Sequence, residues 1–159
     1  MRLTQSAIDH RGAWSALLSP CRELRELEVV VTLPGDEEAE IISSITSASI
    51  RKIFLVHRWS NWGFSWRRVN WETFDEPLCR LVDKLGSTHQ LEVEIRIVDA
   101  GVTSVSEDTN LGVIVNSFAA FREKGRIKLV CVGQDGKEHV VYPIDPRCPN
   151  PPASLRRTK

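Results

Sequence analysis

The sequence predicts an α/β fold built on a mainly parallel sheet, and three observations lead to this prediction. Segments with the two-residue period of a strand alternate along the chain with segments that have the spacing of an amphipathic helix. Strand, helix, strand order is typical of parallel strands joined by helical crossovers. An Asp135-Gly136 turn between the last two extended segments predicts a closing antiparallel hairpin. The chain has 159 residues, 42% of them hydrophobic, which suffices for one domain with its own core.

The first half of the pattern begins with a short helix expected over 13–18. A strand is expected over 24–31, because Leu27 and Val29 alternate with Glu26 and Glu28. A helix follows over 36–45, with Asp36 as its expected N-cap and further acids in its first turn, where the helix dipole favours negative charge. Apolar residues over 50–55 mark the second strand.

The second half repeats the pattern. A helix is expected over 74–85, with Asp75 as N-cap and Gly86 as C-terminal cap. The segment 91–97 alternates most regularly and predicts the third strand. One amphipathic helix is expected over 111–121, a fourth strand over 127–131, and a returning strand over 139–142.

Two parallel architectures fit this order, and the charge pattern of the strands favours one of them. A doubly wound sheet buries both faces of its strands, which then read as continuous apolar runs. Three of the four strands instead alternate, with charged residues on the second face. We therefore expect a leucine-rich-repeat-like open solenoid of about four irregular strand–helix units, with a mainly parallel sheet and a C-terminal hairpin.

Composition and charge exclude several classes of protein. The 21 basic residues are offset by 21 acidic ones, so binding to nucleic acid through overall positive charge is not expected. The N-terminus has no apolar segment typical of a secretory signal, and no run approaches the ~18 residues of a membrane span. Four scattered cysteines do not make a disulfide scaffold, and Cys79 and Cys131 lie in apolar patterns. A cytoplasmic or nuclear protein without membrane contact is expected.

Catalytic and metal-binding motifs are absent from the sequence. There is no phosphate-binding loop, no zinc-protease motif and no nucleophile elbow, since Arg67 stands where the second glycine of G-x-S-x-G would be. No cysteines or histidines have metal-site spacing. We expect no catalytic residues, no metal and no cofactor, and therefore a protein that is not an enzyme.

The segment 58–71 is a tryptophan- and arginine-rich insertion. Tryptophan and arginine are enriched at the hot spots of protein interfaces, so it is a candidate partner-binding segment. Its candidate residues are Trp59, Trp62, Phe64, Trp66, Arg67 and Arg68. Two alternatives remain open here. The indoles could pack over the following helix, or the aromatic and basic residues could stack on a nucleic acid or small ligand.

The second candidate surface is the exposed face of the strands. In the solenoid, one residue of each successive strand would point onto a single concave surface: Glu28, Phe54, Glu94 and Lys128. Val30, Val56, Arg96 and Val130 would lie beside them. Repeat proteins bind partners on such a face, although a solvated face without a ligand is an equal alternative.

The sequence also resembles a known family. Ser19-Pro20-Cys21-Arg22-Glu23-Leu24-Arg25-Glu26-Leu27-Glu28 resembles the entry to a repeat in fungal (basidiomycete-type) F-box/leucine-rich-repeat proteins. The following helix and strand, 41–53, and the segments 78–85 and 121–126 are similar to that group. The resemblance implies an adaptor of a ubiquitin ligase whose repeats hold the substrate. About 20 residues precede the first strand, too few for an F-box, so docking to a ligase scaffold is expected only if an F-box precedes this region.

Taken together, the sequence predicts a non-catalytic protein-recognition module. Residues 1–142 would form a single leucine-rich-repeat-like domain, and 143–159 a disordered, proline-rich basic tail. The partner would be a protein. Two other hypotheses remain: a small α/β enzyme with a site at the carboxyl ends of the strands, near His57 and the loop after Val98, or a truncated fragment with no independent function.

Overall fold

The computed structural model describes residues 2–3, 17–18, 20–32, 36–58, 68–86, 90–98 and 111–143. These residues form one six-stranded sheet with the strands in chain order, β1-β2-β3-β4-β5-β6. Neighbouring strands from β1 to β5 are parallel, and β6 pairs antiparallel with β5. The strands are β1 (Arg2–Leu3), β2 (Glu26–Val30), β3 (Lys52–Arg58), β4 (Glu92–Val98), β5 (Arg126–Val132) and β6 (Glu138–Tyr142). The expected parallel α/β sheet with a closing hairpin is confirmed.

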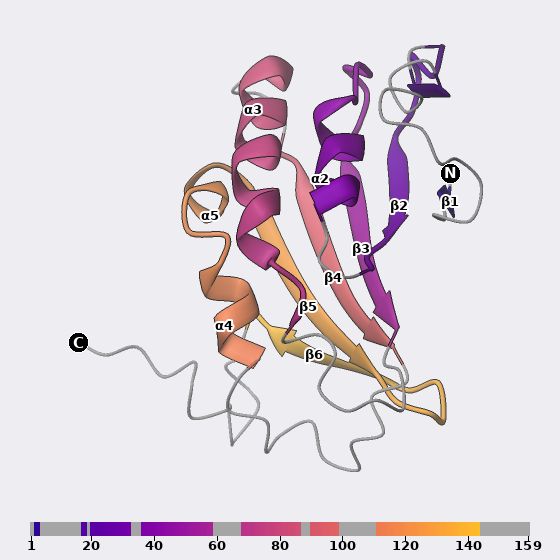
Figure 1. Cartoon of the computed structure of the whole chain (residues 1–159), viewed down its shortest axis with the longest axis vertical. Helices are drawn as coiled ribbons and strands as arrows, with labels where there is room; N and C mark the ends of the chain where they lie inside the picture. Colours follow the sequence, from indigo (N-terminus) through magenta and orange to yellow (C-terminus); the bar gives the residue numbers. More distant parts are fainter. Residues whose placement is uncertain are drawn as a thin grey trace.

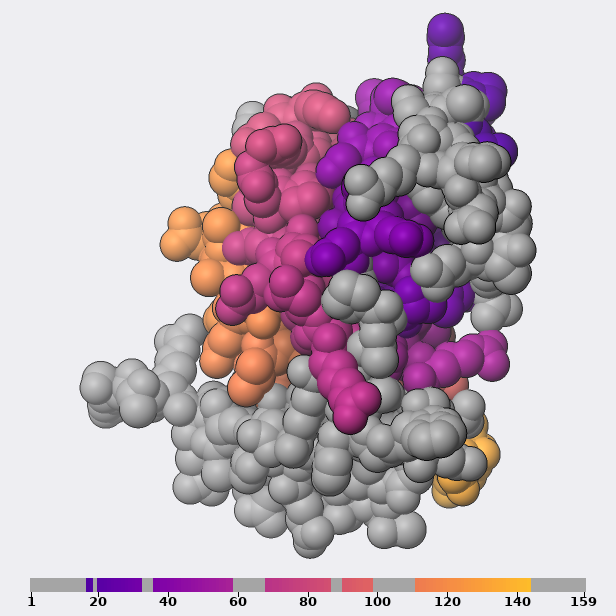
Figure 2. All heavy atoms as spheres, in the orientation of Figure 1, coloured from indigo at the N-terminus to yellow at the C-terminus, as the bar shows by residue number. Residues whose placement is uncertain are grey.

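The described helices lie together on one side of this sheet (Figure 1). They are α2 (Asp36–Ser43), the 3₁₀ helix η3 (Trp71–Phe74), α3 (Asp75–Leu85), α4 (Leu111–Asn116) and α5 (Phe121–Lys124). In the space-filling view, atoms of α2 and α3 form a continuous layer in front of the strands (Figure 2). No described helix is both long and apolar enough to cross a membrane.

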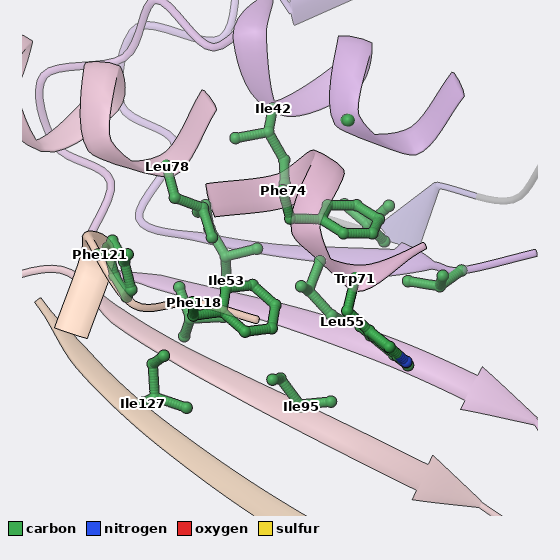
Figure 3. Packing of buried hydrophobic residues seen from close by; sticks show 14 of the residues in the cluster. Ile42, Ile53, Leu55, Trp71, Phe74, Leu78, Ile95, Phe118, Phe121 and Ile127 are labelled. Carbon is green, nitrogen blue, oxygen red and sulfur yellow. The ribbon is translucent and has the colours of Figure 1, made fainter. Parts of the chain in front are cut away.

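The hydrophobic core fills the space between the helices and the sheet (Figure 3). Ile53, Leu55 and Ile95 project from the strands toward the helices, and each is fully buried. From the helical side, Phe74 and Leu78 meet them and are equally buried. Burying a large apolar side chain stabilises the fold by about 1.5–3 kcal/mol. The alternation read from the sequence therefore separates a core face from a second face of the same strands.

The caps and turns are partly as expected. Gly86 is the C-cap of α3, with a positive φ of 80°, and its N–H donates to the carbonyl of Val82. Gly136 has φ 75° in the turn between β5 and β6, as the Asp-Gly signal predicts. The residue at the N-cap of α3, however, is Phe74, and its side chain makes no capping bond. Asp75 is the first residue of α3, so the prediction that it is the N-cap was wrong.

The single helix expected over 111–121 is divided into two helices, α4 and α5. Hydrogen bonds to the side chain of Asp75 explain the division. In a continuous helix the N–H groups of Ala120 and Phe121 would donate to carbonyls four residues earlier. Instead they donate to the carboxylate of Asp75, at 3.1 Å and 2.8 Å. Asp75 thus caps α5 from another helix, and the chain turns between Ser117 and Ala120.

Two further elements differ from the expectation. The sheet includes β1, in which Arg2 pairs with Glu28 and Leu3 with Val29, although a two-residue strand leaves no periodic signal in the sequence. The end of the expected insertion 58–71 belongs to the core. Trp71 begins η3 and is 4% exposed, and Val69 beside it is also buried.

Candidate functional site: the open face of the sheet

The side of the sheet opposite the helices is a surface to which β2, β3, β4 and β5 all contribute. We call it the open face, and it comprises Glu26, Glu28, Val30, Lys52, Phe54, Val56, Glu92, Glu94, Arg96, Arg126, Lys128 and Val130. These positions alternate with the core residues because successive side chains of a strand point to opposite sides of a sheet.

The strand register brings the four predicted positions of this face into one row. Glu28 pairs with Phe54, Phe54 with Glu94, and Glu94 with Lys128. Directly opposed side chains on parallel neighbours lie close enough to interact. The structure therefore brings together all four residues that the sequence placed on one surface. That they bind a partner stays a prediction.

Glu94 is the centre of this row, and it is a buried carboxylate. Only 1% of its side chain is exposed, although its neighbours on the open face are half-buried. Three cations surround it. Lys52 Nζ lies 2.8 Å from Oε2, Arg96 Nε 2.6 Å from Oε1, and Lys128 Nζ 3.3 Å from Oε2. A buried charge needs this kind of compensation, because desolvation without partners costs several kcal/mol.

The protonation of Glu94 follows from this arrangement. Burial by itself would raise the pKa of the carboxyl group, but the hydrogen bonds from Lys52 and Arg96 outweigh it and lower the pKa below its ordinary value. On Lys52, burial acts to lower the pKa, while Glu92 and Glu94 raise it above its ordinary value. Glu94 is therefore a carboxylate and Lys52 an ammonium group near neutral pH.

Phe54 adds an aromatic surface to the charged cluster. Its ring is half-buried, and two of the cations that bind Glu94 lie over it. Lys52 Nζ is 4.7 Å from the ring centroid and Arg96 Cζ is 5.2 Å from it. Cation–π contacts of this length contribute about 0.5–1 kcal/mol at exposed sites. They also hold the two cations in fixed positions beside the ring.

Charge is distributed unevenly across the open face. β2 contributes the acids Glu26 and Glu28, and β5, at the other side, contributes the bases Arg126 and Lys128. Between them, Lys52 bridges Glu92 and Glu94, at 2.8 Å from each. From β2 to β5 the face thus changes from acidic to basic, and β6 adds the acid Glu138, which lies 3.3 Å from Arg96.

The valines of the open face differ in exposure. Val30 is half-buried, whereas Val56 and Val130 are 5% and 0% exposed. The expectation that valines line an exposed surface beside the central row was therefore wrong for Val56 and Val130. Val140 of β6, which pairs with Val130, is 53% exposed. The accessible part of the face consists of Phe54, Val30, the exposed and half-buried ions and this edge.

Most of the tryptophan- and arginine-rich insertion cannot be placed on this surface. Trp59, Trp62, Phe64, Trp66 and Arg67 lie outside the described residues. Arg68 lies within them and is exposed. Trp71, which the sequence analysis included in the insertion but did not select as a binding residue, is buried in the core.

Lys52 is the residue of the charged cluster that sequence reasoning missed. Its alternation with Ile53 puts it on the open face, but its role depends on β4 lying beside β3 with Glu92 directly opposite. Arg96 was expected only beside the central row, yet it binds Glu94 and lies over Phe54. Which residues of two strands lie opposite each other cannot be predicted from the sequence of either strand alone when the strands are forty residues apart.

A second group of polar residues lies where β2 and β3 end. His57 is 4% exposed, and its Nδ1 lies 3.0 Å from the carbonyl oxygen of Val31. The Trp71 ring meets it edge-on, with centroids 6.4 Å apart. Glu38, 3% exposed, accepts hydrogen bonds from the N–H and the hydroxyl of Thr32 at 2.9 Å and 2.5 Å. Burial lowers the pKa of His57, more than the Val31 carbonyl and Glu38 raise it, so the ring is neutral at pH 7.

The cysteines and possible metal ligands show no reactive arrangement in the described part of the chain. Cys79 and Cys131 are buried, as the apolar pattern predicts. Burial raises the pKa of Cys79, which disfavours the reactive thiolate. Among the residues that the structure describes, no group of three histidine, cysteine, aspartate or glutamate side chains could hold a metal ion.

Comparison with known proteins gives no relative from which a role could be transferred. No protein-family model, no curated protein and no solved structure matches this chain. The chemistry of the open face must therefore be argued from its own residues.

Proposed function

We propose that this chain is a non-catalytic protein-recognition module that binds its partner through the open face. The observation that carries the proposal is the one-sided fold: the described helices cover one side of the sheet and leave Phe54 and its ring of ions on the other (Figure 1). An ordinary parallel sheet is covered on both sides, so an aromatic residue that is only half-buried at the centre of one calls for an explanation.

The chemistry of the open face suits a protein partner. Interface hot spots favour aromatic and arginine side chains held in fixed positions, and the Phe54–Arg96 pair has this composition. The acidic β2 side and the basic β5 side would fix the orientation of a partner with the opposite polarity. Glu94 would not contact the partner itself, because it is buried, but it positions the cations that would.

The strand order supports the relation to leucine-rich-repeat proteins that the resemblance implies. Parallel strands that follow one another in chain order, with the described helices between them on the same side, are what stacked strand–helix repeats require. We therefore extend the proposal to a relative of the substrate-binding repeats of fungal F-box proteins. In such an adaptor the open face would hold the protein that is to be ubiquitinated, and an F-box preceding this region would supply the link to the ligase.

The experiment compares open-face variants with matched helical-side variants. The tagged protein and its Phe54→Ala and Arg96→Ala variants are used to retain partners from a lysate of the source cells, with Val113→Ala and Arg80→Ala as controls. Val113 is 59% exposed, and Arg80 is exposed on α3. Circular dichroism verifies that each variant folds, and mass spectrometry quantifies the retained proteins.

The expected result is a specific protein whose recovery falls at least fivefold with both open-face variants and stays unchanged with both controls. The same order of affinities must then hold for that protein in purified form. Equal recovery with all four variants, or no protein retained by the folded wild type, would overturn the proposal.

One observation favours the other class, a small α/β enzyme. His57 and Glu38 lie near the carboxyl ends of parallel strands, where ligands of α/β proteins commonly bind. Both are buried, and each bonds to the chain segment that follows β2. If they served catalysis, His57→Gln would abolish a turnover without lowering stability. If they hold the strand ends, as we expect, it lowers the free energy of unfolding.

A further inference from the structure

A pocket of about 550 Å³ lies at the β5–β6 edge of the sheet, next to α5. Its walls come from the first residues of β5, the last residues of β6 and Arg122 of α5. Pockets of 300–1,000 Å³ are the usual size for small organic ligands. This volume is therefore suited to a small molecule rather than to the broad surface of a protein partner.

Positive charge predominates in the walls of the pocket. Arg122, Arg126 and Lys128 line it, against the single acid Glu92. Glu92 is already bound by Lys52 at 2.8 Å, and Lys128 is bound to Glu94 at 3.3 Å. Within the described residues, Arg122 and Arg126 form no ion pair with an acid. The pocket thus holds two guanidinium groups whose charge no described carboxylate neutralises.

The rest of the pocket is apolar and partly aromatic. Val140, Tyr142 and Pro143 form the β6 wall, and Val140 is 53% exposed although it is a large aliphatic residue. Arg122 lies over the Tyr142 ring, with Cζ 5.5 Å from the centroid. Arg122 also donates from one terminal nitrogen to Asn116 Oδ1, at 3.5 Å. Stacking on an aromatic ring holds the planar guanidinium in place while its other N–H groups stay available to a ligand.

We propose that this pocket binds an organic carboxylate with an apolar body of about the size of an aromatic ring. The planar fork of a guanidinium matches the two oxygens of a carboxylate, and Arg122 and Arg126 supply two such forks. The apolar body lies against Val140, Tyr142 and Pro143, and the removal of its surface from water favours binding. The inference goes beyond partner recognition, because such a ligand fills the pocket without any protein bound to the open face.

The test is a nuclear magnetic resonance titration of the ¹⁵N-labelled full chain with three probes. Phenylacetate carries both the carboxylate and the aromatic body, phenylacetamide lacks the charge, and inorganic phosphate lacks the apolar body. We expect saturable shifts for phenylacetate at the amides of residues 125–130 and 140–142, with a dissociation constant of about 1 mM, as its few atoms allow. Phenylacetamide and phosphate should each bind at least tenfold more weakly.

Two variants locate the site. Arg126→Gln removes one guanidinium from the pocket and should weaken phenylacetate at least fivefold. Arg80→Gln removes an exposed guanidinium from α3 and should leave the titration unchanged. Binding of phenylacetamide or phosphate as strong as that of phenylacetate would overturn the proposal, as would shifts confined to other residues or an unchanged Arg126→Gln titration. If Arg126→Gln does not fold, the three probes on the wild type decide alone.

Discussion

The ring of Phe121 lies so close to Gly125 that a Cβ atom built on the glycine would be 2.3 Å from Cζ of the ring. Phe121 is fully buried at the start of α5, and Gly125 is the C-cap of that helix, with its N–H donating to the Phe121 carbonyl at 2.7 Å. The extended backbone of Gly125, with φ −128°, is one that other residues also adopt. The requirement for glycine therefore comes from space and not from backbone strain.

Gly125→Ala is expected to destabilise the protein by about 1–3 kcal/mol, because the added methyl group displaces a buried ring from a packed core. Urea unfolding monitored by circular dichroism measures the loss. The double variant Gly125→Ala with Phe121→Leu should cost less than the sum of the single variants, since the smaller side chain makes room. Simple additivity of the two losses would show that the contact is not the cause.

Asp75→Ala is expected to destabilise the protein by about 1 kcal/mol, because Ala120 and Phe121 lose the acceptor of their N–H groups. Asp75→Asn keeps an oxygen at the same place and should lose less. Asp83→Ala is the matched control on the same helix. Its carboxylate binds Lys124 at 2.7 Å but is 62% exposed, so we expect a change within about 0.5 kcal/mol in urea unfolding. Equal losses for Asp75→Ala and Asp83→Ala would contradict the capping role.

Glu94→Gln is expected to cost about 2–3 kcal/mol. The substitution keeps the shape of the side chain but leaves Lys52, Arg96 and Lys128 around a neutral amide, and their partial exposure to water limits the penalty. Glu76→Gln, which breaks the exposed pair with Arg80 on α3, should change the free energy of unfolding by less than about 0.5 kcal/mol. Because the pKa of Glu94 is lowered in the folded state, its stabilisation is complete above the ordinary pKa and is lost as the pH falls through the folded value.

His57 should make stability depend on pH in a different range. Burial lowers the pKa of His57 in the folded state, so below about pH 6.5 the unfolded chain takes up a proton that the folded chain does not. Stability due to this group is therefore complete above that pH and falls as the solution is acidified, by at most about 1.4 kcal/mol per pH unit. Urea unfolding at pH 7.5 and 5.5 should show a smaller decrease for His57→Gln than for the wild type. His139→Gln, at an exposed position of β6, should keep the wild-type decrease.

The sequence predicted the features that local patterns encode. Alternation identified β2, β4 and β5, helical spacing identified α2 and α3, and an Asp-Gly pair identified the hairpin turn. The division between α4 and α5 could not be predicted, since it depends on Asp75, 45 residues earlier in the chain. Trp71 was assigned to the insertion because the segment 58–71 is rich in tryptophan and arginine. Its contacts with Phe74 and His57 instead put it in the core.

For the candidate site too, the sequence predicted what local patterns encode and missed what depends on contacts between distant segments. Alternation alone placed Glu28, Phe54, Glu94 and Lys128 on one face. It could not predict that Glu94 is buried, because the three cations around it come from three strands whose relative register is set by the packing of the opposite face. The β5–β6 pocket was not predicted either, since its residues come from β4, α5, β5 and β6 and follow no common spacing.

The order of the strands also has a consequence for synthesis on the ribosome. A nascent chain delivers β2, β3, β4 and β5 in the same sequence in which the sheet uses them, so each strand emerges when the edge it must pair with has already been made. In a sheet whose strand order reverses, some strands must wait for a neighbour that is translated later. Here no described strand waits in this way, and β6 joins last by folding back on the strand that has just preceded it.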